Sequence, residues 1–225
     1  MKDSGYVWNH DLMKDFLMQG VSRRWLVPLI QGYVSTDIAR TFLSRQISIT
    51  LLSKRHTSRA GTRFNQRGVD EEGKVANFVT SELLVEQGSY LFGHVQVRGS
   101  IPLFWSQKAK KSTKVCFKDN WQKNRLAMNK HWDEILDKYH YVYVLNLLSQ
   151  QEKPDEARLG SVMNDLINER RDNRLSIYNF DFHARLKGDN FGDIEEIMGM
   201  LEPELMNGDK QRFFIQSREK NTTYL

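Results

Sequence analysis

The sequence has very little cysteine and no long apolar run. Cys116 is the only cysteine among 225 residues, so no disulfide forms within the chain and a metal site of several thiolates is excluded. The longest apolar stretches, 26–30 and 141–145, are far shorter than the roughly 20 residues of a membrane-spanning helix. The N-terminus lacks an apolar segment followed by small residues, so we expect no secretory signal. These absences predict a chain that stays in a reducing compartment, on the cytosolic side of membranes.

The composition fits a folded domain with a moderate basic excess. Hydrophobic residues make up 40% of the chain and the mean hydropathy is −0.59, values that suit one globular domain with a sizeable core. Lys and Arg number 33 against 28 Asp and Glu, which gives a net charge of +5. This balance favours anionic partners such as nucleic acid, lipid headgroups or phosphate substrates. Because the aromatic residues do not alternate with basic ones, as they do on a base-stacking platform, we expect no nucleic-acid binding.

The first half of the chain is predicted to be rich in strands. Asn9 is a possible N-cap of a short amphipathic helix whose Leu12, Phe16 and Leu17 share one face. Gly73 can adopt the positive φ of a hairpin turn. The expected elements are a helix over 10–19, β-rich runs at 26–34 and 47–52 joined by a helix around 36–44, antiparallel strands at 63–69 and 74–82, and a strand at 90–97.

The second half alternates helical and β-rich segments, which predicts a parallel crossover. The expected elements are a helix over 120–139, a strand over 141–148, a helix over 155–171 and a strand over 175–182, followed by a helix near 193–206 and a strand at 212–216. The order β-α-β requires parallel strands. The predicted fold class is therefore α/β, a mixed sheet with an antiparallel hairpin region and parallel βαβ crossovers, without internal repeats.

A long motif runs through the middle of the chain. It reads Arg59-Ala-Gly-Thr-Arg-Phe-Asn-Gln-Arg-Gly-Val-Asp-Glu-Glu-Gly-Lys-Val-Ala-Asn-Phe-Val79 and then Val97-Arg-Gly-Ser-Ile-Pro-Leu-Phe-Trp-Ser-Gln107. Supporting pieces follow the same order: Trp8-Asn9, Trp25-Leu-Val-Pro-Leu-Ile-Gln-Gly32, Asn146-Leu-Leu148 and Asn179-Phe-Asp-Phe-His183. Over nearly its whole length the chain resembles the Sac-domain phosphoinositide phosphatases, and its motifs are most similar to those of the synaptojanin-like branch.

The resemblance implies an activity whose nucleophile this sequence does not contain. The family hydrolyses phosphate monoesters of phosphatidylinositol phosphates with a Cys-x5-Arg loop, in which the thiolate attacks and the loop cradles the phosphate. Cys116 is followed six positions later by Gln122, so we expect it to be an ordinary thiol. In the family this loop follows the region that resembles 211–225, and a further subdomain precedes Trp8. We therefore expect residues 1–225 to be a partial Sac domain without turnover.

One departure from the family pattern changes the chemistry of a strand. Where the family reads Val-Glu-Thr-Glu-Gln, this chain reads Val79-Thr80-Ser81-Glu82-Leu83. The substitutions replace one acid and one amide with residues that supply neither the same charge nor the same hydrogen bonds. We therefore expect no role in this chain that depends on the first acid.

Several side chains are candidates for binding an anion. An arginine fork binds phosphate through two parallel hydrogen bonds, although arginines at these positions also suit structural ion pairs with Asp70, Glu71, Glu72 or Glu82. Asp181 and His183 are two residues apart, hence on one face of a presumed strand, and are equally consistent with a structural pair. The predicted substrate- or anion-binding candidates are Arg63, Arg67, Asn77, Arg98, Asp181 and His183.

A basic loop gives the second candidate surface. The segment 108–114 can contact anionic lipid or remain a solvated loop, and its membrane-surface candidates are Lys108, Lys110, Lys111 and Lys114.

The predicted function is phosphatidylinositol phosphate hydrolysis by family resemblance, with this chain inactive as given. The six histidines lack close metal-ligand spacing and no phosphate-binding Gly-x4-Gly-Lys motif is present, so we expect no metal and no cofactor. The expected partner is an anionic phosphoinositide membrane surface, which the chain contacts peripherally from the cytosolic side. Protein partners stay open. The alternatives are a non-catalytic pseudophosphatase that binds phosphoinositides or a partner, and a fragment with no stable function.

Overall fold

The computed structural model divides the chain into two units that are each built from separated segments. It describes residues 4–40, 45–61, 66–107, 115–118, 120–186, 192, 195, 197, 199, 202, 214–217 and 222–224. Unit 1 consists of Met1–Ala60, Asn77–Gly99 and Gln211–Leu225, and unit 2 of Gly61–Ala76 and Ser100–Lys210.

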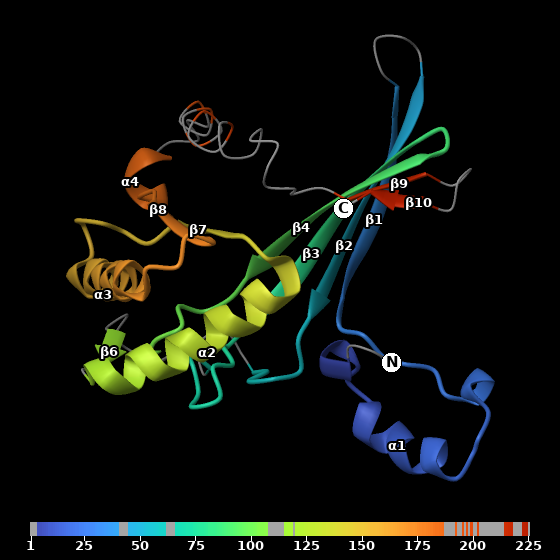
Figure 1. The fold of residues 1–225 in the computed structure, drawn as a ribbon, viewed down its shortest axis with the longest axis horizontal. Helices are drawn as coiled ribbons and strands as arrows, with labels where there is room; N and C mark the ends of the chain where they lie inside the picture. Colours follow the sequence, from blue (N-terminus) through green and yellow to red (C-terminus); the bar gives the residue numbers. More distant parts are fainter. Residues whose placement is uncertain are drawn as a thin grey trace. The chain divides into compact units, whose positions relative to one another are not determined.

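Unit 1 is an antiparallel sheet preceded by short helices (Figure 1). The helical elements are η1 (Ser4–Tyr6), α1 (His10–Met18) and η2 (Arg23–Trp25). The strands are β1 (Gly32–Arg40), β2 (Gln46–Arg55), β3 (Val79–Gln87), β4 (Tyr90–Arg98), β9 (Phe214–Ser217) and β10 (Thr222–Tyr224). They pair in the order β1-β2-β3-β4-β9-β10. The strands predicted at 47–52, 90–97 and 212–216 are thus confirmed, with shifted ends.

The helix expected around 36–44 is wrong, because β1 occupies this segment as far as Arg40. Every residue from Gly32 to Arg40 pairs with a residue of β2, and the hydroxyls of Thr36 and Thr50 lie 2.9 Å apart across the two strands. Pairing along nine residues outweighs the local helical pattern. Residues 41–44 lie outside the described part of the chain.

Asn9 precedes α1, but its amide serves the following loop instead of capping the helix. Its Nδ2 donates to the carbonyl of Val27 at 2.9 Å, and its Oδ1 accepts from the backbone N–H of Leu29 at 2.8 Å. These two bonds fix an extended loop where a strand was expected from 26. The predicted helix is confirmed, but its buried side chain is Met13, whereas Leu12 and Phe16 are exposed.

Unit 2 contains the predicted parallel crossover. Its elements are β5 (Trp105–Gln107), β6 (Val115–Phe117), α2 (Trp121–Tyr139), β7 (Val142–Asn146), α3 (Pro154–Arg170), β8 (Leu175–Asn179) and α4 (Phe182–Arg185). β5 pairs antiparallel with β6, and β7 pairs parallel with β8. The α/β class is therefore confirmed, and the antiparallel and parallel pairings lie in separate sheets.

The two long helices of unit 2 begin where their sequences predict. The side chain of Asn120 caps α2 by accepting from the N–H of Lys123 at 2.9 Å. Pro154 opens α3, where its missing N–H costs nothing. The apolar faces of both helices are buried, and together they supply much of the core of this unit: Ala127, Met128, Trp132, Ile135, Leu136, Leu159, Met163, Leu166 and Ile167.

The hairpin expected around Gly73 is reduced to a turn. Gly73 has the predicted positive φ, at 83°, but among the described residues the pairing around it is a single bridge between Val69 and Val75. The strand predicted from 74 begins instead at Val79. Residues 62–65 lie outside the described part of the chain. Of the helix expected at 193–206 the structure describes Glu195, Ile197, Gly199 and Glu202, all helical.

Candidate functional site

The Arg67-Gly68 segment of the motif is built into a tight backbone junction of unit 2. Gly68 has φ of 70°, and a Cβ on it would lie 2.5 Å from the carbonyl oxygen of Leu103. Its N–H donates to the hydroxyl of Ser100 at 2.8 Å, and Val69 donates to the carbonyl of Leu103 at 3.0 Å. The glycine is thus required by close packing of two motif segments against each other.

The three candidate arginines have different surroundings. Arg67 donates from Nη2 to Oε1 of Gln107 at 2.9 Å, and its guanidinium lies 5.3 Å from the centroid of the Trp105 ring. Arg98 is exposed at the end of β4, in unit 1. Arg63 lies outside the described residues. A common anion-binding surface for the three therefore stays a prediction.

The ion-pair alternative for the arginines stays a prediction, and three of its four carboxylates have other contacts in the structure. Glu82 pairs with Lys54, whose Nζ lies 2.6 Å from Oε1. The side chain of Asp70 accepts from the backbone N–H of Lys74 at 2.7 Å, within its own turn. Nζ of Lys123 lies 3.9 Å from Oε1 of Glu71.

Asn77 holds a strained backbone position at the start of unit 1's second segment. Its φ is 57°, a region that asparagine tolerates better than most residues. Its Oδ1 accepts from Nη2 of Arg55 at 3.1 Å. The side chain therefore bonds an arginine side chain here, while its predicted role toward an anion stays a prediction.

The departure at Thr80 fits the interior that surrounds it. Thr80 is 2% exposed and its hydroxyl contacts the hydroxyl of Tyr6. The next residue, Ser81, lies with its hydroxyl 2.7 Å from that of Ser53. Neutral hydroxyls satisfy one another in this place, where a buried carboxylate would carry a large desolvation cost.

The lysine candidates Lys108, Lys110, Lys111 and Lys114 lie outside the described residues, so the membrane-contact prediction for this loop stays open. Cys116 is exposed and lies in β6 opposite Ser106. Within the described part of the chain, no group of three or more His, Cys, Asp or Glu side chains is placed to hold a metal ion. No helix of that part is both long and apolar enough to cross a membrane.

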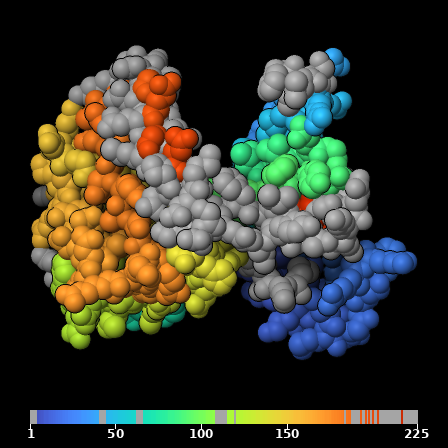
Figure 2. All heavy atoms as spheres, turned by 45° about the horizontal axis from the view of Figure 1, so that its top comes forward, coloured from blue at the N-terminus to red at the C-terminus, as the bar shows by residue number. Residues whose placement is uncertain are grey.

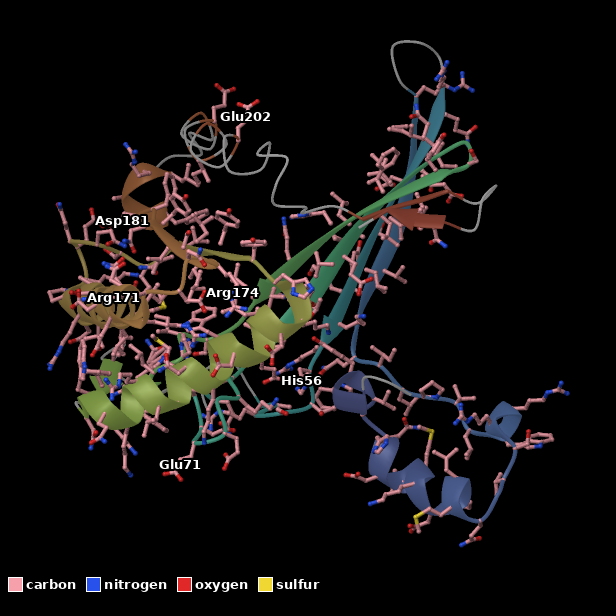
Figure 3. All side chains as sticks on the ribbon, viewed as in Figure 1. His56, Glu71, Arg171, Arg174, Asp181 and Glu202 are labelled. Atoms are coloured by element: carbon pink, nitrogen blue, oxygen red, sulfur yellow. The ribbon has the colours of Figure 1, made fainter. Side chains whose placement is uncertain are left out.

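Asp181 is the central residue of a polar cluster at the carboxyl end of β8. Figure 3 shows Asp181 beside α4. Its Oδ2 accepts from the N–H of Gln150 at 2.7 Å and from the hydroxyl of Ser149 at 3.3 Å. Its Oδ1 accepts from the N–H of Ala184 at 3.0 Å and so caps α4. The carboxylate thereby ties the loop after β7 to the loop after β8.

The expectation that Asp181 and His183 share a strand face is wrong. β8 ends at Asn179, and Asp181 is the N-cap of α4, with His183 inside that short helix. The side-chain cap at Asp181 ends the extended run three residues earlier than the apolar pattern suggests. The side chain of His183 lies outside the described part of the structure.

Three amides extend this cluster across the ends of the parallel strands. Asn146 is 4% exposed and donates from Nδ2 to Oδ1 of Asn179 at 2.8 Å. Asn179 in turn donates to Oδ1 of Asn164, on α3, at 3.4 Å. A Cβ on Gly160 of α3 would lie 2.9 Å from Nδ2 of Asn146, so the glycine lets the helix approach the strand end.

We call Asn146, Ser149, Asn179 and Asp181 the strand-end cluster. Asn146, Asn179 and Asp181 lie in motif pieces that the sequence singles out, whereas Ser149 has no sequence signal beyond its position after Leu148. Carboxyl ends of parallel strands are where α/β proteins place their ligand sites, so this cluster is the best-built candidate site in the described residues.

An open hollow of about 520 Å³ adjoins the strand-end cluster. Its polar lining includes Gln150, Arg158, Ser161, Asn164 and Asn179. Gln150 donates from its backbone N–H to Asp181 of the cluster, and Asn179 is itself a member of the cluster. The hollow offers amides, a hydroxyl and one guanidinium, which suits a ligand with both hydroxyl groups and negative charge.

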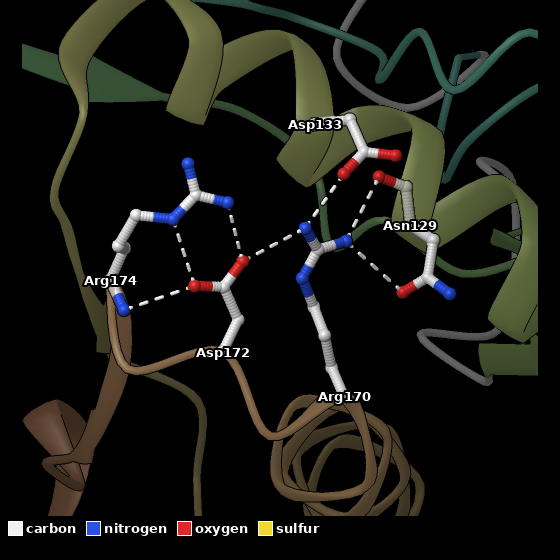
Figure 4. A network of polar contacts seen from close by, with 5 residues as sticks. All are labelled: Asn129, Asp133, Arg170, Asp172 and Arg174. Atoms are coloured by element: carbon white, nitrogen blue, oxygen red, sulfur yellow. Dashed lines mark hydrogen bonds and ion pairs between the residues drawn. The ribbon is translucent and has the colours of Figure 1, made fainter.

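An ion network holds α3 to α2 elsewhere in unit 2 (Figure 4). Arg170 contacts Asp133 at 2.7 Å and Asp172 at 3.1 Å, and Asp172 also binds Arg174 at 2.8 Å. The hydrogen bonds from Arg174, and then those from Arg170, lower the pKa of Asp172 well below its usual range. These charges are all engaged with each other, so we assign them a structural role.

A buried histidine fixes the Gly73 turn to α2. His131 is 7% exposed, and its Nδ1 lies 3.1 Å from the carbonyl oxygen of Gly73. Burial lowers its pKa from 6.5 to about 4, with a smaller opposing effect from the Gly73 bond. The ring is therefore neutral at pH 7 and Nδ1–H is the donor to Gly73.

Comparisons with known proteins find similar sequences over most of the chain. A family model described as the SacI homology domain matches residues 1–187. The polyphosphatidylinositol phosphatase INP53 of Saccharomyces cerevisiae is 28% identical over 95% of this chain. The phosphoinositide phosphatase SAC8 of Arabidopsis thaliana is 31% identical over 97%, and synaptojanin-1 of Homo sapiens is 30% identical over 94%.

The chain spans only a minor part of these relatives. It covers 20% of the length of INP53, 36% of SAC8 and 13% of synaptojanin-1. The likeness therefore concerns one region of longer proteins.

Proposed function

The chain belongs to the SacI homology domain family, and on that basis we propose that it forms part of a phosphoinositide phosphatase, an enzyme that hydrolyses phosphate monoesters on inositol lipids. The observation that carries this proposal is the family match over residues 1–187, together with relatives that are named phosphoinositide phosphatases. We further propose that residues 1–225 supply scaffold and headgroup contacts, and that they work without a metal or cofactor.

The absence of a suitable nucleophile supports the proposal that these 225 residues alone release no phosphate. The sequence contains no Cys-x5-Arg pattern. Cys116 lies in a short strand with its neighbour across the sheet at Ser106, and Gln122 stands where a phosphate-binding arginine would be needed. A thiol without that loop has neither the amide cradle nor the guanidinium that stabilise a transferring phosphoryl group.

The second candidate function is a non-catalytic module that binds phosphoinositides or a partner protein. The net charge of +5 and the exposed Arg98 favour attraction to an anionic surface. The module would contact membranes peripherally from the cytosolic side, by electrostatics that salt screens. Both candidates share recognition of an inositol phosphate headgroup and differ in turnover.

Vesicle binding tests this shared recognition. The purified chain is cosedimented with vesicles of neutral lipid that contain 5% phosphatidylinositol 4-phosphate, and with vesicles in which phosphatidylserine supplies the same total charge. We expect clearly stronger binding to the phosphoinositide vesicles at low salt, weakened by high salt and by Arg98→Gln. Arg125→Gln, which alters an exposed arginine of α2 paired with Glu169, is the matched control. Equal binding to both anionic vesicles would overturn headgroup recognition.

Phosphate release on the same vesicles tests turnover. We expect no release above the buffer control from the native chain or from Cys116→Ser. Release that Cys116→Ser abolishes would identify this thiol as a nucleophile and refute the assignment of chemistry to a Cys-x5-Arg loop.

A further inference from the structure

We propose that the chain self-associates through β1, whose open edge pairs with β1 of a second copy to form one continuous sheet. The inference goes beyond the proposed function and does not depend on it. β1 stands at one end of the strand order, so within the described part of the chain it pairs on one side only, with β2. Figure 2 shows the hairpin of these two strands, in blue and light blue, at the surface of the molecule.

β1 lacks the features that usually keep an edge strand from pairing. It runs for nine residues in continuous register with β2, without a bulge. It contains no proline and no lysine, and the side chains of Tyr33, Val34 and Ile38 are 60%, 65% and 68% exposed. The strand at the other end of the described order, β10, has only three residues. Because a very short edge strand offers little to pair with, β1 is the edge that attracts a partner.

The register shows which backbone groups face the open edge. The N–H of Arg55 donates to the carbonyl of Gln31 at 2.8 Å, and these two residues continue the β1–β2 pairing by one position. Ladder bonds in an antiparallel pair alternate, so every second residue of β1 bonds to β2. The hydroxyls of Thr36 and Thr50, 2.9 Å apart, fit a position between these bonds, where side chains lie closer. The residues whose N–H and carbonyl groups face outward are therefore Gly32, Val34, Thr36, Ile38 and Arg40.

The strand is its own complement in one register. Antiparallel pairing about a two-fold axis at Thr36 uses all nine residues and places Val34 of each copy opposite Ile38 of the other. Both side chains are exposed in the single chain, so their pairing removes apolar surface from water. Asp37 then lies opposite Ser35 of the second copy, whose hydroxyl can donate to the carboxylate.

Neighbouring registers lack this match. An axis at Asp37 would put two carboxylates directly opposite each other, which is destabilising. An axis at Ser35 would leave the last two residues of each strand without partners and would place Gly32 opposite Ile38, so the apolar pairs are lost. A two-fold axis also closes the assembly, because both copies use the same edge. The expected product of pairing through β1 is therefore a dimer and not a fibre.

The size of this interface predicts a weak dimer. The pairing forms about ten backbone hydrogen bonds between the two copies. Nine residues a side are fewer than the roughly 20–30 residues a side of a standard interface. We therefore expect a dissociation constant on the order of 10–100 μM, so that the dimer appears and disappears within an accessible range of protein concentration.

Sedimentation of the whole chain tests the register through its two-fold axis. Thr36 pairs with its own copy, so a charge introduced there meets the same charge. The native chain should pass from monomer to dimer between roughly 1 and 300 μM. Thr36→Lys and Thr36→Glu should each raise the dissociation constant at least tenfold, and an equimolar mixture of the two variants should restore the native value, because lysine then faces glutamate.

Matched controls separate edge pairing from general charge and folding effects. Gln19→Lys and Gln19→Glu make the same charge changes at an exposed residue after α1, outside the sheet, and we expect both to dimerise like the native chain. Far-ultraviolet circular dichroism and a thermal melt confirm that each variant is folded. If a Thr36 variant does not fold, Ile38→Lys and Val34→Glu replace the pair. Each should be monomeric alone, and their mixture should dimerise, because the two positions lie opposite each other.

Amide exchange followed by NMR reads the pairing directly. The N–H groups of Val34, Thr36 and Ile38 should exchange more slowly as the protein concentration rises, whereas that of Ser35, which bonds to β2, should be protected throughout. A native chain that stays monomeric at every concentration would overturn the proposal. So would a dimer that survives in both Thr36 variants, or a mixture that restores nothing. Slow exchange of these three groups in a monomer would show that another segment of the same chain covers the edge, and would also refute self-association.

Discussion

The neutral, buried ring of His131 predicts a specific dependence of stability on pH. In the unfolded chain a histidine binds its proton near pH 6.5, whereas burial holds the pKa of His131 at about 4 in the folded chain. Between these values the unfolded state binds more protons, so the free energy of unfolding falls as the pH falls from 7 to 4. Each pKa unit corresponds to about 1.4 kcal/mol, and the whole effect is therefore about 3 kcal/mol.

The assay compares the native chain with His131→Gln, which keeps a side-chain donor for the carbonyl of Gly73. Urea unfolding is followed at intervals from pH 7 to pH 4, and the difference between the two proteins isolates the titration of His131 from that of all other groups. The variant is less stable at pH 7, but it should lose about 3 kcal/mol less than the native chain on acidification.

Two results would refute the reasoning about His131. Parallel stability curves for the two proteins would show that the ring is not held neutral by burial. An NMR titration of the His131 ring in the folded native chain, which needs no variant, should have its midpoint near pH 4, and a midpoint near pH 6.5 would contradict the structure directly.

Two further predictions concern the same unit. Asp172→Asn should lower the free energy of unfolding by about 2 kcal/mol at pH 7, because charged hydrogen bonds are lost. The difference from the native chain should shrink below about pH 4, where the carboxyl of the unfolded chain becomes protonated. Equal losses of stability in thermal melts at pH 7 and at pH 3 would contradict this prediction. Gly68→Ala should cost at least about 3 kcal/mol, since positive φ and a clash with the carbonyl of Leu103 add together. Gly88→Ala, at φ of 58° with open space around it, should cost only about 1 kcal/mol, and similar losses for both in urea unfolding would show that packing at Gly68 is not tight.

Local patterns predict the elements whose pairing partners are near in sequence. The helices α2 and α3 begin close to the predicted residues because Asn120 caps one and Pro154 opens the other. β7 and β8 pair in parallel as predicted, because one helix connects them and such a crossover joins neighbouring parallel strands. The local pattern predicts a helix over part of β1. The segment is a strand because β2 pairs with it along its whole length, and no local signal shows that pairing.

The candidate site is predictable only in part for the same reason. The motif pieces identify Asn146, Asn179 and Asp181, but the bond from Asp181 to the N–H of Gln150 spans 31 residues and has no periodicity that marks it. The capping bond from Asp181 to the N–H of Ala184 is local, yet an aspartate after an apolar run fits the end of a strand as well as the start of a helix. The partners of Asp181 therefore come from tertiary structure.

The interleaving of the two units along the chain governs the order in which they can be completed during synthesis. β4 pairs with β9, and about 120 residues separate the paired segments of these two strands. At a translation rate of 5–20 residues per second, the free edge of β4 waits roughly 6–25 s for its partner to leave the ribosome. Nearly all of unit 2 is synthesised in that interval, so it can fold while the sheet of unit 1 still has an open edge. During that interval the unpaired edge of β4 can pair with other strands, as exposed edge strands do.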